Sequence, residues 1–93
     1  MALSYQMSEP ESQDPAKVEE FIELLTQHDR MLTGYVMSLV ASSADAQDIL
    51  QDTKMALWRS MARFQSGTNF GDWACKTALN RILAYRKKKG REK

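Results

Sequence analysis

The sequence predicts an all-α fold, a compact bundle of three to four helices, and three observations support this prediction. The chain has 93 residues, a length that suits one domain. Hydrophobic residues make up 43% of it and charged residues 27%, a balance typical of a chain that folds around one modest core. Apolar residues recur mostly at spacings of three and four, and no segment alternates apolar and polar residues as a half-buried strand does.

The first helix is predicted to follow a flexible N-terminal arm, residues 1–14, which contains little that could be buried. Asp14 followed by Pro15 is typical of an N-cap with proline at the first helical position, so a helical domain is expected over residues 15–93. The helix either runs unbroken to about residue 40 or bends near Gly34. Its apolar face comprises Val18, Phe21, Ile22, Leu25, Leu32, Val36, Leu39 and Val40.

A second helix is predicted after Ser42, because a serine with an acid three residues later, here Asp45, favours a capped helix start. The segment that follows this helix, residues 65–69, has the glycine and polar residues of a loop. One face of the second helix is expected to be buried along its length, and it comprises Ala46, Ile49, Leu50, Thr53, Leu57, Met61 and Phe64.

A third helix is predicted from about Phe70 to Lys88, with Asn69 as its cap and Asp72 in its first turn. One side of this helix carries mainly small and apolar residues that suit a core, namely Ala74, Ala78, Ile82 and Tyr85. The opposite side carries Lys76, Asn80 and Lys87, with Trp73 at its edge and Arg81 on one flank.

This polar side suits nucleic acid, because cations neutralise phosphates, asparagine can bond to a base edge, and an aromatic ring can stack on an unpaired base. Simpler explanations exist for each feature. Basic residues at a helix end also complement the helix dipole, and Asn80 could be merely solvated. Trp73, Phe64 and Phe70 could be core residues.

The charges of the two halves differ strongly although the whole chain has a formal charge of only +1. Residues 1–52 contain ten acids and two bases, a net charge of −8, whereas residues 53–93 contain eleven bases and two acids, a net charge of +9. This asymmetry predicts two surfaces for two partners, the basic one suited to phosphates. The alternative is a bundle that neutralises itself by packing an acidic helix beside a basic one.

Several function classes are excluded by composition. Cys75 is the single cysteine and His28 the single histidine, so neither an internal disulfide nor a typical His/Cys metal site is expected. No nucleophile–base spacing or phosphate-binding loop favours an enzyme, and no cofactor is predicted. The N-terminus is not typical of a signal peptide, and no apolar run is long enough to span a bilayer, so we expect a cytoplasmic protein that does not enter membranes.

Two stretches together resemble a known family. The first is residues 44–53, ADAQDILQDT, followed by Leu57-Trp58-Arg59 and Arg63-Phe64. The second is residues 64–73, FQSGTNFGDW, followed by Thr77-Ala78-Leu79-Asn80. In this order they are similar to the second conserved region of sigma-70 family RNA polymerase sigma factors, and most similar to the extracytoplasmic-function (ECF) type. The resemblance covers about residues 18–91.

The resemblance implies a promoter-recognition domain without catalytic activity. It implies docking on the clamp helices of the RNA polymerase β′ subunit through Asp48, Gln51 and Asp52, and it adds an anti-sigma factor as a candidate partner. It also implies capture of bases flipped from the non-template strand of the minus-ten element, with Arg86 and the basic C-terminal cluster helping to hold phosphates. The DNA-binding residues expected on this basis are Phe64, Gln65, Ser66, Asn69, Phe70, Trp73, Lys76, Asn80, Arg81, Lys87 and Lys88.

The sequence departs from the family pattern in three places. Lys54 replaces an aromatic or large apolar residue, and Gln65 is neutral where relatives are often charged. The later family region, a helix-turn-helix that reads the minus-thirty-five element, is absent, which favours a fragment of a longer factor over a minimal protein. A second hypothesis is a helical protein-interaction adaptor whose basic tail binds nucleic acid or an anionic membrane surface.

Overall fold

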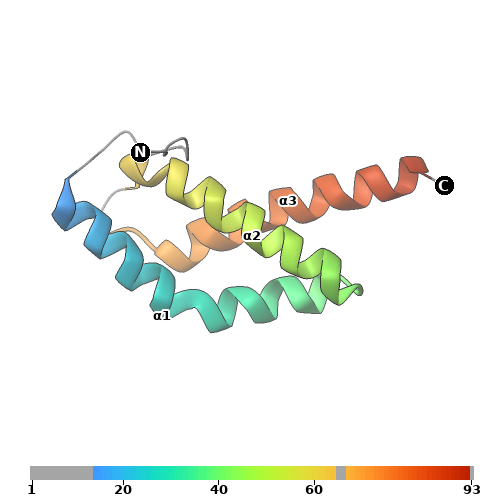
Figure 1. Cartoon of the computed structure of the whole chain (residues 1–93), viewed down its shortest axis with the longest axis horizontal. Coiled ribbons are helices and arrows are strands. Elements are labelled where there is room, and N and C mark those ends of the chain that lie inside the picture. The colour runs from blue at the N-terminus through green and yellow to red at the C-terminus, as the bar shows by residue number, and fades with distance from the viewer. Residues whose placement is uncertain (1–13, 65–66, 93) are drawn as a thin grey trace, which may run out of the picture.

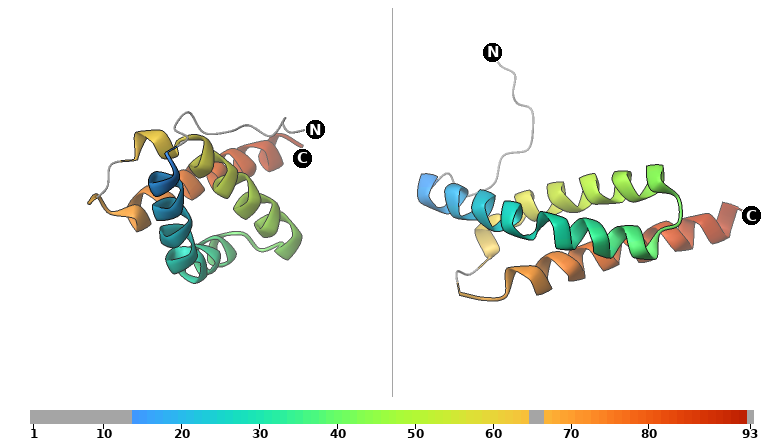
Figure 2. Two further views of the ribbon diagram at one scale, coloured as in Figure 1. Left: turned by 60° about the vertical axis from the view of Figure 1, so that its left-hand side comes forward. Right: turned by 90° about the horizontal axis from the view of Figure 1, so that it is seen from below.

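The computed structural model describes residues 14–64 and 67–92, and it confirms the predicted all-α bundle. The helices are α1 (Pro15–Leu39), α2 (Ser43–Arg59) and α3 (Phe70–Glu92), with a short 3-10 helix, η1 (Met61–Arg63), after α2. α1 and α2 run in opposite directions, and α3 crosses them on one side (Figures 1 and 2). The C-terminal end of α3 extends past the ends of the other two helices in Figure 1 and in the right view of Figure 2. Within the described residues there is no strand.

α1 begins as predicted and does not break at Gly34. The carboxylate of Asp14 accepts a hydrogen bond from the backbone N–H of Ala16 at 3.1 Å, and the helix continues to Leu39. Its last carbonyls are approached from α3, since Arg86 Nη2 donates to the Leu39 carbonyl at 2.9 Å. Ile22 is an exception to the predicted apolar face, because 53% of its surface is exposed.

α2 begins at the predicted cap but ends sooner than expected. The Ser42 hydroxyl accepts from the backbone N–H of Asp45 at 3.3 Å. The helix ends at Arg59, and the chain then forms the tighter η1. The prediction of one helical face through Met61 and Phe64 was therefore wrong about where α2 ends. It was right about burial: Met61 is 1% exposed and Phe64 8%, because the tighter turn carries both inward.

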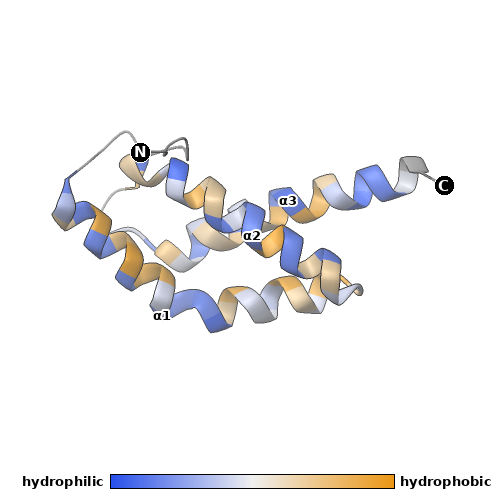
Figure 3. Ribbon diagram, in the orientation of Figure 1, coloured by the Kyte–Doolittle hydropathy of each residue, from blue (hydrophilic) through white to orange (hydrophobic). Residues whose placement is uncertain are grey.

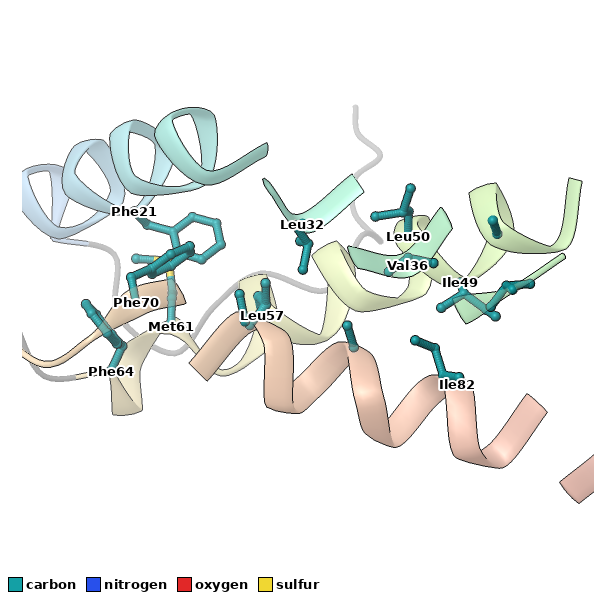
Figure 4. Packing of buried hydrophobic residues seen from close by; sticks show 14 residues of the cluster. Phe21, Leu32, Val36, Ile49, Leu50, Leu57, Met61, Phe64, Phe70 and Ile82 are labelled. Carbon is teal, nitrogen blue, oxygen red and sulfur yellow. The ribbon is translucent and has the colours of Figure 1, made fainter. Parts of the chain in front are cut away.

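The core has an aromatic end and an aliphatic remainder (Figure 4). Phe21, Phe64 and Phe70 gather with Met61 at the end near η1. The rest is filled mainly by aliphatic residues of all three helices, including Leu32, Val36, Leu50, Leu57 and Ile82. Thr53 is the one buried polar residue among those described, and its hydroxyl donates to the Ile49 carbonyl at 2.7 Å. Burial therefore leaves that hydroxyl satisfied.

α3 starts at the predicted cap and lies very close to α1 there. Asn69 Oδ1 accepts from the backbone N–H of Asp72 at 3.0 Å, and the helix runs beyond Lys88 to Glu92. Gly71 is buried in the first turn, where a Cβ atom would lie 3.3 Å from Asn69 Oδ1 and 3.3 Å from His28 Cδ2. Glycine at this position therefore permits the close approach of the two helices.

Candidate nucleic-acid interface

A cavity of about 550 Å³ lies where η1, the following loop and the first turns of α3 meet. The loop turns back toward α3 at Gly67, whose φ of 95° glycine adopts without strain. The described residues that line the cavity are Ser60, Arg63, Phe64, Thr68, Asn69, Asp72, Trp73 and Lys76. The cavity thus combines an aromatic wall with hydrogen-bonding and charged side chains.

The aromatic wall is a stacked pair. The rings of Phe64 and Trp73 lie 5.0 Å apart at an interplanar angle of 18°. Phe70 meets both edge-on, with centroid distances of 5.5 Å to Phe64 and 5.6 Å to Trp73. Phe70 is only 3% exposed, so it supports the wall from the core and leaves almost no surface on which a base could stack. Trp73, which is half-buried, offers more surface.

Asn69 has a structural task at the rim of the cavity. Its side-chain oxygen caps α3 through the backbone N–H of Asp72, which leaves the amide nitrogen available as a donor. A ligand in the cavity would therefore meet Asn69 as a donor, held in place by the cap. The capping bond fixes the side chain to the first turn of a long helix, whose N-terminal dipole adds a positive partial charge there.

The start of the loop is tied to a distant part of the chain. Lys17 Nζ, in the first turn of α1, donates to the Phe64 carbonyl at 2.8 Å across a separation of 47 residues. This bond is partly buried. It holds the backbone of Phe64 at the point where the chain leaves η1, and Phe64 is the ring that stacks on Trp73.

The charges at the cavity are mixed but favour anions. Arg63 and Lys76 are exposed cations from η1 and α3, and Asp72 is the carboxylate among the lining residues. Further cations continue along the exposed side of α3, where Figure 3 shows a largely hydrophilic helix end. A polyanion could follow this side from the cavity toward the C-terminus.

The fold brings together four of the predicted DNA-binding residues: Phe64, Asn69, Trp73 and Lys76 all line the cavity. Gln65 and Ser66 lie outside the described residues. The remaining surface residues are exposed on α3 beyond the cavity, with Asn80 one turn after Lys76, followed by Arg81, Lys87 and Lys88. Arg86 is partly committed elsewhere, since it donates to the Leu39 carbonyl.

Sequence analysis missed Ser60, Arg63, Thr68 and Asp72 as cavity residues. It also missed Lys17, which lies far from the loop in sequence. Arg63, Thr68 and Asp72 stand in the stretches that carry the family resemblance, and Ser60 lies close to Phe64 along the chain. The sequence could not show that the side chains of Ser60 and Arg63 face the cavity, because α2 was expected to continue where the chain instead forms η1.

The acidic residues expected to contact a protein partner lie on the surface of α2. Asp48, Gln51 and Asp52 are all exposed. Lys54, the unusual lysine on the same helix, contacts α1 through an ion pair, with its Nζ 2.7 Å from Asp29 Oδ1. The cation is therefore accommodated at the junction of α1 and α2, and its side chain is 35% exposed there.

Three further features of the described residues concern metal ligands, membrane-length helices and the single thiol. In residues 14–64 and 67–92, no three His, Cys, Asp or Glu side chains come together in a way that could hold a metal ion. Among the helices described, none has the length and apolar character needed to cross a membrane. Burial, with the negative charge of Asp72, raises the pKa of the Cys75 thiol and favours its unreactive protonated form.

Comparison with known proteins gives one consistent result. Residues 24–92 match the family described as Sigma-70 region 2. The chain is 32% identical over 62 residues to RNA polymerase sigma factor CarQ of Myxococcus xanthus, covering 67% of this chain and 36% of that protein. It is 31% identical over 67 residues to RNA polymerase sigma factor NccH of Alcaligenes xylosoxydans xylosoxydans, covering 72% of this chain and 36% of that protein. The chain thus spans about a third of the length of these curated relatives, and no solved structure matches it.

Proposed function

This chain belongs to the sigma-70 region 2 family, and we propose that it acts in transcription initiation by binding core RNA polymerase and capturing unpaired bases of the minus-ten promoter element. The captured bases are those of the non-template strand. One observation carries the proposal: the 550 Å³ cavity beside the stacked Phe64–Trp73 pair combines an aromatic wall, an amide donor and cations. Proteins bind single-stranded nucleic acid through cationic contacts and aromatic stacking, and an amide donor can bond to a base edge.

The cavity residues have distinct tasks in this mechanism. An extruded base stacks on the exposed part of Trp73, and Asn69 donates from its amide nitrogen. Lys76 and Arg63 neutralise the adjoining phosphates. Stacking on an aromatic side chain contributes about 1–3 kcal/mol per base, which offsets the few kcal/mol that extrusion from a duplex costs. The domain thereby stabilises the melted strand without any covalent step.

Asn80 is proposed to contact the strand next to the captured base. It is exposed one turn beyond Lys76 and outside the cavity. Arg81, Lys87 and Lys88 extend the same helix with cations that hold phosphates. Asn80→Ala should cost ~1–3 kcal/mol at one preferred base and relax the preference there. Lys87→Gln should instead weaken all sequences evenly and flatten the salt dependence. If Asn80→Ala weakens all sequences evenly, Asn80 does not read a base.

The protein partner is proposed to contact α2. Asp48, Gln51 and Asp52 form an exposed acidic surface suited to a cationic partner, and we assign this surface to the clamp helices of the β′ subunit. The test is capture of core polymerase by the chain carrying Asp48→Asn, Gln51→Ala and Asp52→Asn together. The charge-matched control is Glu19→Gln with Glu23→Gln, two exposed acids on α1. Equal capture by both variants would exclude α2 as the contact.

The base-capture proposal is tested with single-stranded oligonucleotides that differ at one position, measured by fluorescence anisotropy at fixed salt. Trp73→Phe keeps an aromatic residue in place but reduces the stacking surface. It should weaken the preferred oligonucleotide roughly two- to fivefold and narrow the difference between sequences. Trp58→Phe is the matched control, because Trp58 is another half-buried tryptophan that does not line the cavity.

Two outcomes of this panel would contradict the proposal. One is equal, weak and salt-sensitive binding of every sequence by the unmodified chain, which would favour the helical adaptor with a basic nucleic-acid-binding tail. The other is an equal effect of Trp73→Phe and Trp58→Phe, which would show that the cavity has no part in base capture.

A further inference from the structure

Two sulfur atoms meet at the junction of α1 and α3. The Cys75 thiol donates to the Met31 thioether, with Sγ and Sδ 3.5 Å apart, although the two residues are separated by 44 positions in the sequence. Met31 is 43% exposed and Cys75 is half-buried, so both can be reached from solution. Thiolate and thioether sulfurs are soft ligands, and among metal ions they favour Cu(I).

His28 lies beside this pair of sulfurs, three residues before Met31 on α1. A Cβ atom added to Gly71 would lie 3.3 Å from His28 Cδ2 and 3.4 Å from Met31 Cε, so the imidazole edge and the end of the thioether border the same space. Cδ2 is bonded to Nε2, and Cε is bonded to Sδ. Gly71 precedes Cys75 by one turn of α3. We call Cys75, Met31 and His28 the sulfur cluster.

The hydrogen bond of the His28 ring suits a metal ligand. Nδ1 lies 2.7 Å from the Leu24 carbonyl oxygen. A carbonyl oxygen only accepts, so Nδ1 carries the hydrogen, and in the neutral ring Nε2 has the free lone pair. Metal-binding histidines almost always donate their other ring N–H to such a partner, which fixes the tautomer and the ring orientation. The ring also packs on Phe70, with their centroids 5.1 Å apart.

The separation of the two sulfurs fits one small ion between them. A metal–sulfur bond is about 2.3 Å long, and two such bonds across 3.5 Å enclose an angle of about 100°. A trigonal angle of about 120° would need the sulfurs to move apart by only about 0.5 Å at that bond length. Met31 can supply this movement, because its side chain has three rotatable bonds.

The Cys75 thiol must lose its proton to bind an ion through thiolate. Burial, and after it the negative charge of Asp72, raises the pKa of this thiol. A metal ion deprotonates a coordinating thiol outright, and the proton passes to the solvent as the metal–sulfur bond forms. The charge of Asp72 disfavours a free thiolate but favours a cation in the same place.

We propose that Cys75, Met31 and His28 form a binding site for Cu(I) at the junction of α1 and α3. Two sulfurs and the imidazole Nε2 are its ligands. Zn²⁺ is a poorer match, because structural zinc sites take four thiolate, imidazole or carboxylate ligands and no thioether. The three residues line neither of the cavities beside α3, so the site is separate from the proposed base-capture site.

The first test titrates the 93-residue chain with Cu(I) under argon, in competition with a chromophoric Cu(I) chelator, and counts bound ions by native mass spectrometry. We expect one ion per chain, and its loss in Cys75→Ser. Met31→Leu should weaken Cu(I) binding at least roughly tenfold, since loss of even an outer partner of a metal ligand has this effect. Met37→Leu is the matched control, because Met37 is another exposed methionine of α1 that faces a different side of the helix.

Thermal unfolding distinguishes a site with three ligands from a lone thiol. The unfolded chain also offers the thiol, so Cu(I) stabilises the fold only as far as the folded chain binds it more tightly. A tenfold preference for the folded chain should raise the unfolding midpoint by about 5–10 °C in a domain of this size. The same concentration of Zn²⁺ should raise it by less.

Three outcomes would overturn the proposal. The first is equal Cu(I) affinity in Met31→Leu and Met37→Leu, which would show that the thiol acts alone. The others are a complex of two chains around one ion, and an unfolding midpoint that Cu(I) leaves unchanged. If circular dichroism shows Cys75→Ser to be unfolded, Met31→Leu and His28→Gln decide, because each should weaken binding at least roughly tenfold. No nucleic acid enters these measurements, so their result is independent of base capture.

Discussion

Replacing Lys17 with methionine should make the backbone at Phe64, beside the cavity, more mobile, although Lys17 itself does not line the cavity. Lys17 belongs to α1, and its Nζ is 2.8 Å from the carbonyl oxygen of Phe64. Methionine keeps a long side chain and a similar helix propensity, so the helix itself should persist. What is removed is the bond that holds the start of the loop. The stacked contact between Phe64 and Trp73 depends on that backbone position.

The expected magnitude follows from the exposure of this bond. A hydrogen bond to a charged group contributes about 1.5–3 kcal/mol when it is well shielded. This one is only partly buried, and solvent screening lowers its contribution to about 1 kcal/mol. A change of about 1 kcal/mol shifts a local equilibrium roughly fivefold. If base capture requires the loop conformation that this bond holds, the apparent affinity for a single-stranded oligonucleotide falls by up to roughly fivefold.

Lys54→Met is the matched control for this experiment. It also removes one lysine from a helix, but Lys54 pairs with Asp29 at the junction of α1 and α2 rather than with the loop. The two side chains are 35% and 50% exposed, so their pair contributes only about 0.2–1 kcal/mol. Oligonucleotide affinity is measured by anisotropy and unfolding free energy by urea titration, for both variants.

We expect Lys17→Met to lower oligonucleotide affinity by more than Lys54→Met does, with similar small losses of unfolding free energy. Equal affinities in the two variants would refute the reasoning, because the bond to Phe64 would then be irrelevant to the cavity. A large loss of affinity in Lys54→Met would refute it too, since loss of charge alone would explain both results.

Three further predictions concern the bundle itself. Leu57→Ala should lower the unfolding free energy by about 2–5 kcal/mol in urea titrations, because Leu57 is fully buried in the core. Asn69→Ala should cost about 1 kcal/mol and speed hydrogen exchange in the first turn of α3, because it removes the cap. The carboxylate of Asp45 accepts a hydrogen bond from the Tyr85 hydroxyl, and this bond raises the pKa of that phenol. The bond is therefore fully present below the ordinary pKa of tyrosine, and it is lost as pH rises through the raised pKa. Ultraviolet titration should therefore show a later-ionising tyrosine that disappears in Tyr85→Phe but not in Tyr35→Phe.

The helix starts could be predicted from the sequence because caps are local. Asp14, Ser42 and Asn69 each bond to a backbone N–H two or three residues away. The end of α2 could not be predicted, because the apolar spacing continues through Met61 and Phe64 although the chain tightens into η1. A continued α2 and the observed η1 would both bury Met61 and Phe64, so the spacing of apolar residues does not distinguish the two structures.

The cavity was predictable only in part, for a similar reason. The resemblance pointed to Phe64, Asn69, Trp73 and Lys76, which all line it. Lys17 lies 47 residues from its partner, and no local pattern shows that α1 begins beside the loop. A second cavity, of about 440 Å³ between α2 and α3, was also hidden, because summing charges along the chain does not reveal that acids of α2 and cations of α3 line the same cavity.

Gly71 has a consequence for the cavity beside Phe64 and Trp73. Its missing side chain allows the first turn of α3 to lie against His28 and Met31 of α1, where an added carbon would be 3.3–3.4 Å from both. Trp73 and Asn69 are carried on or next to that turn. An added methyl group would also lie 3.3 Å from Asn69 Oδ1, so the side chains of His28 and Asn69 would have to move by a few tenths of an ångström to admit it. Because Asn69 lines the cavity and caps α3, a change behind the aromatic wall would be felt at the cavity itself.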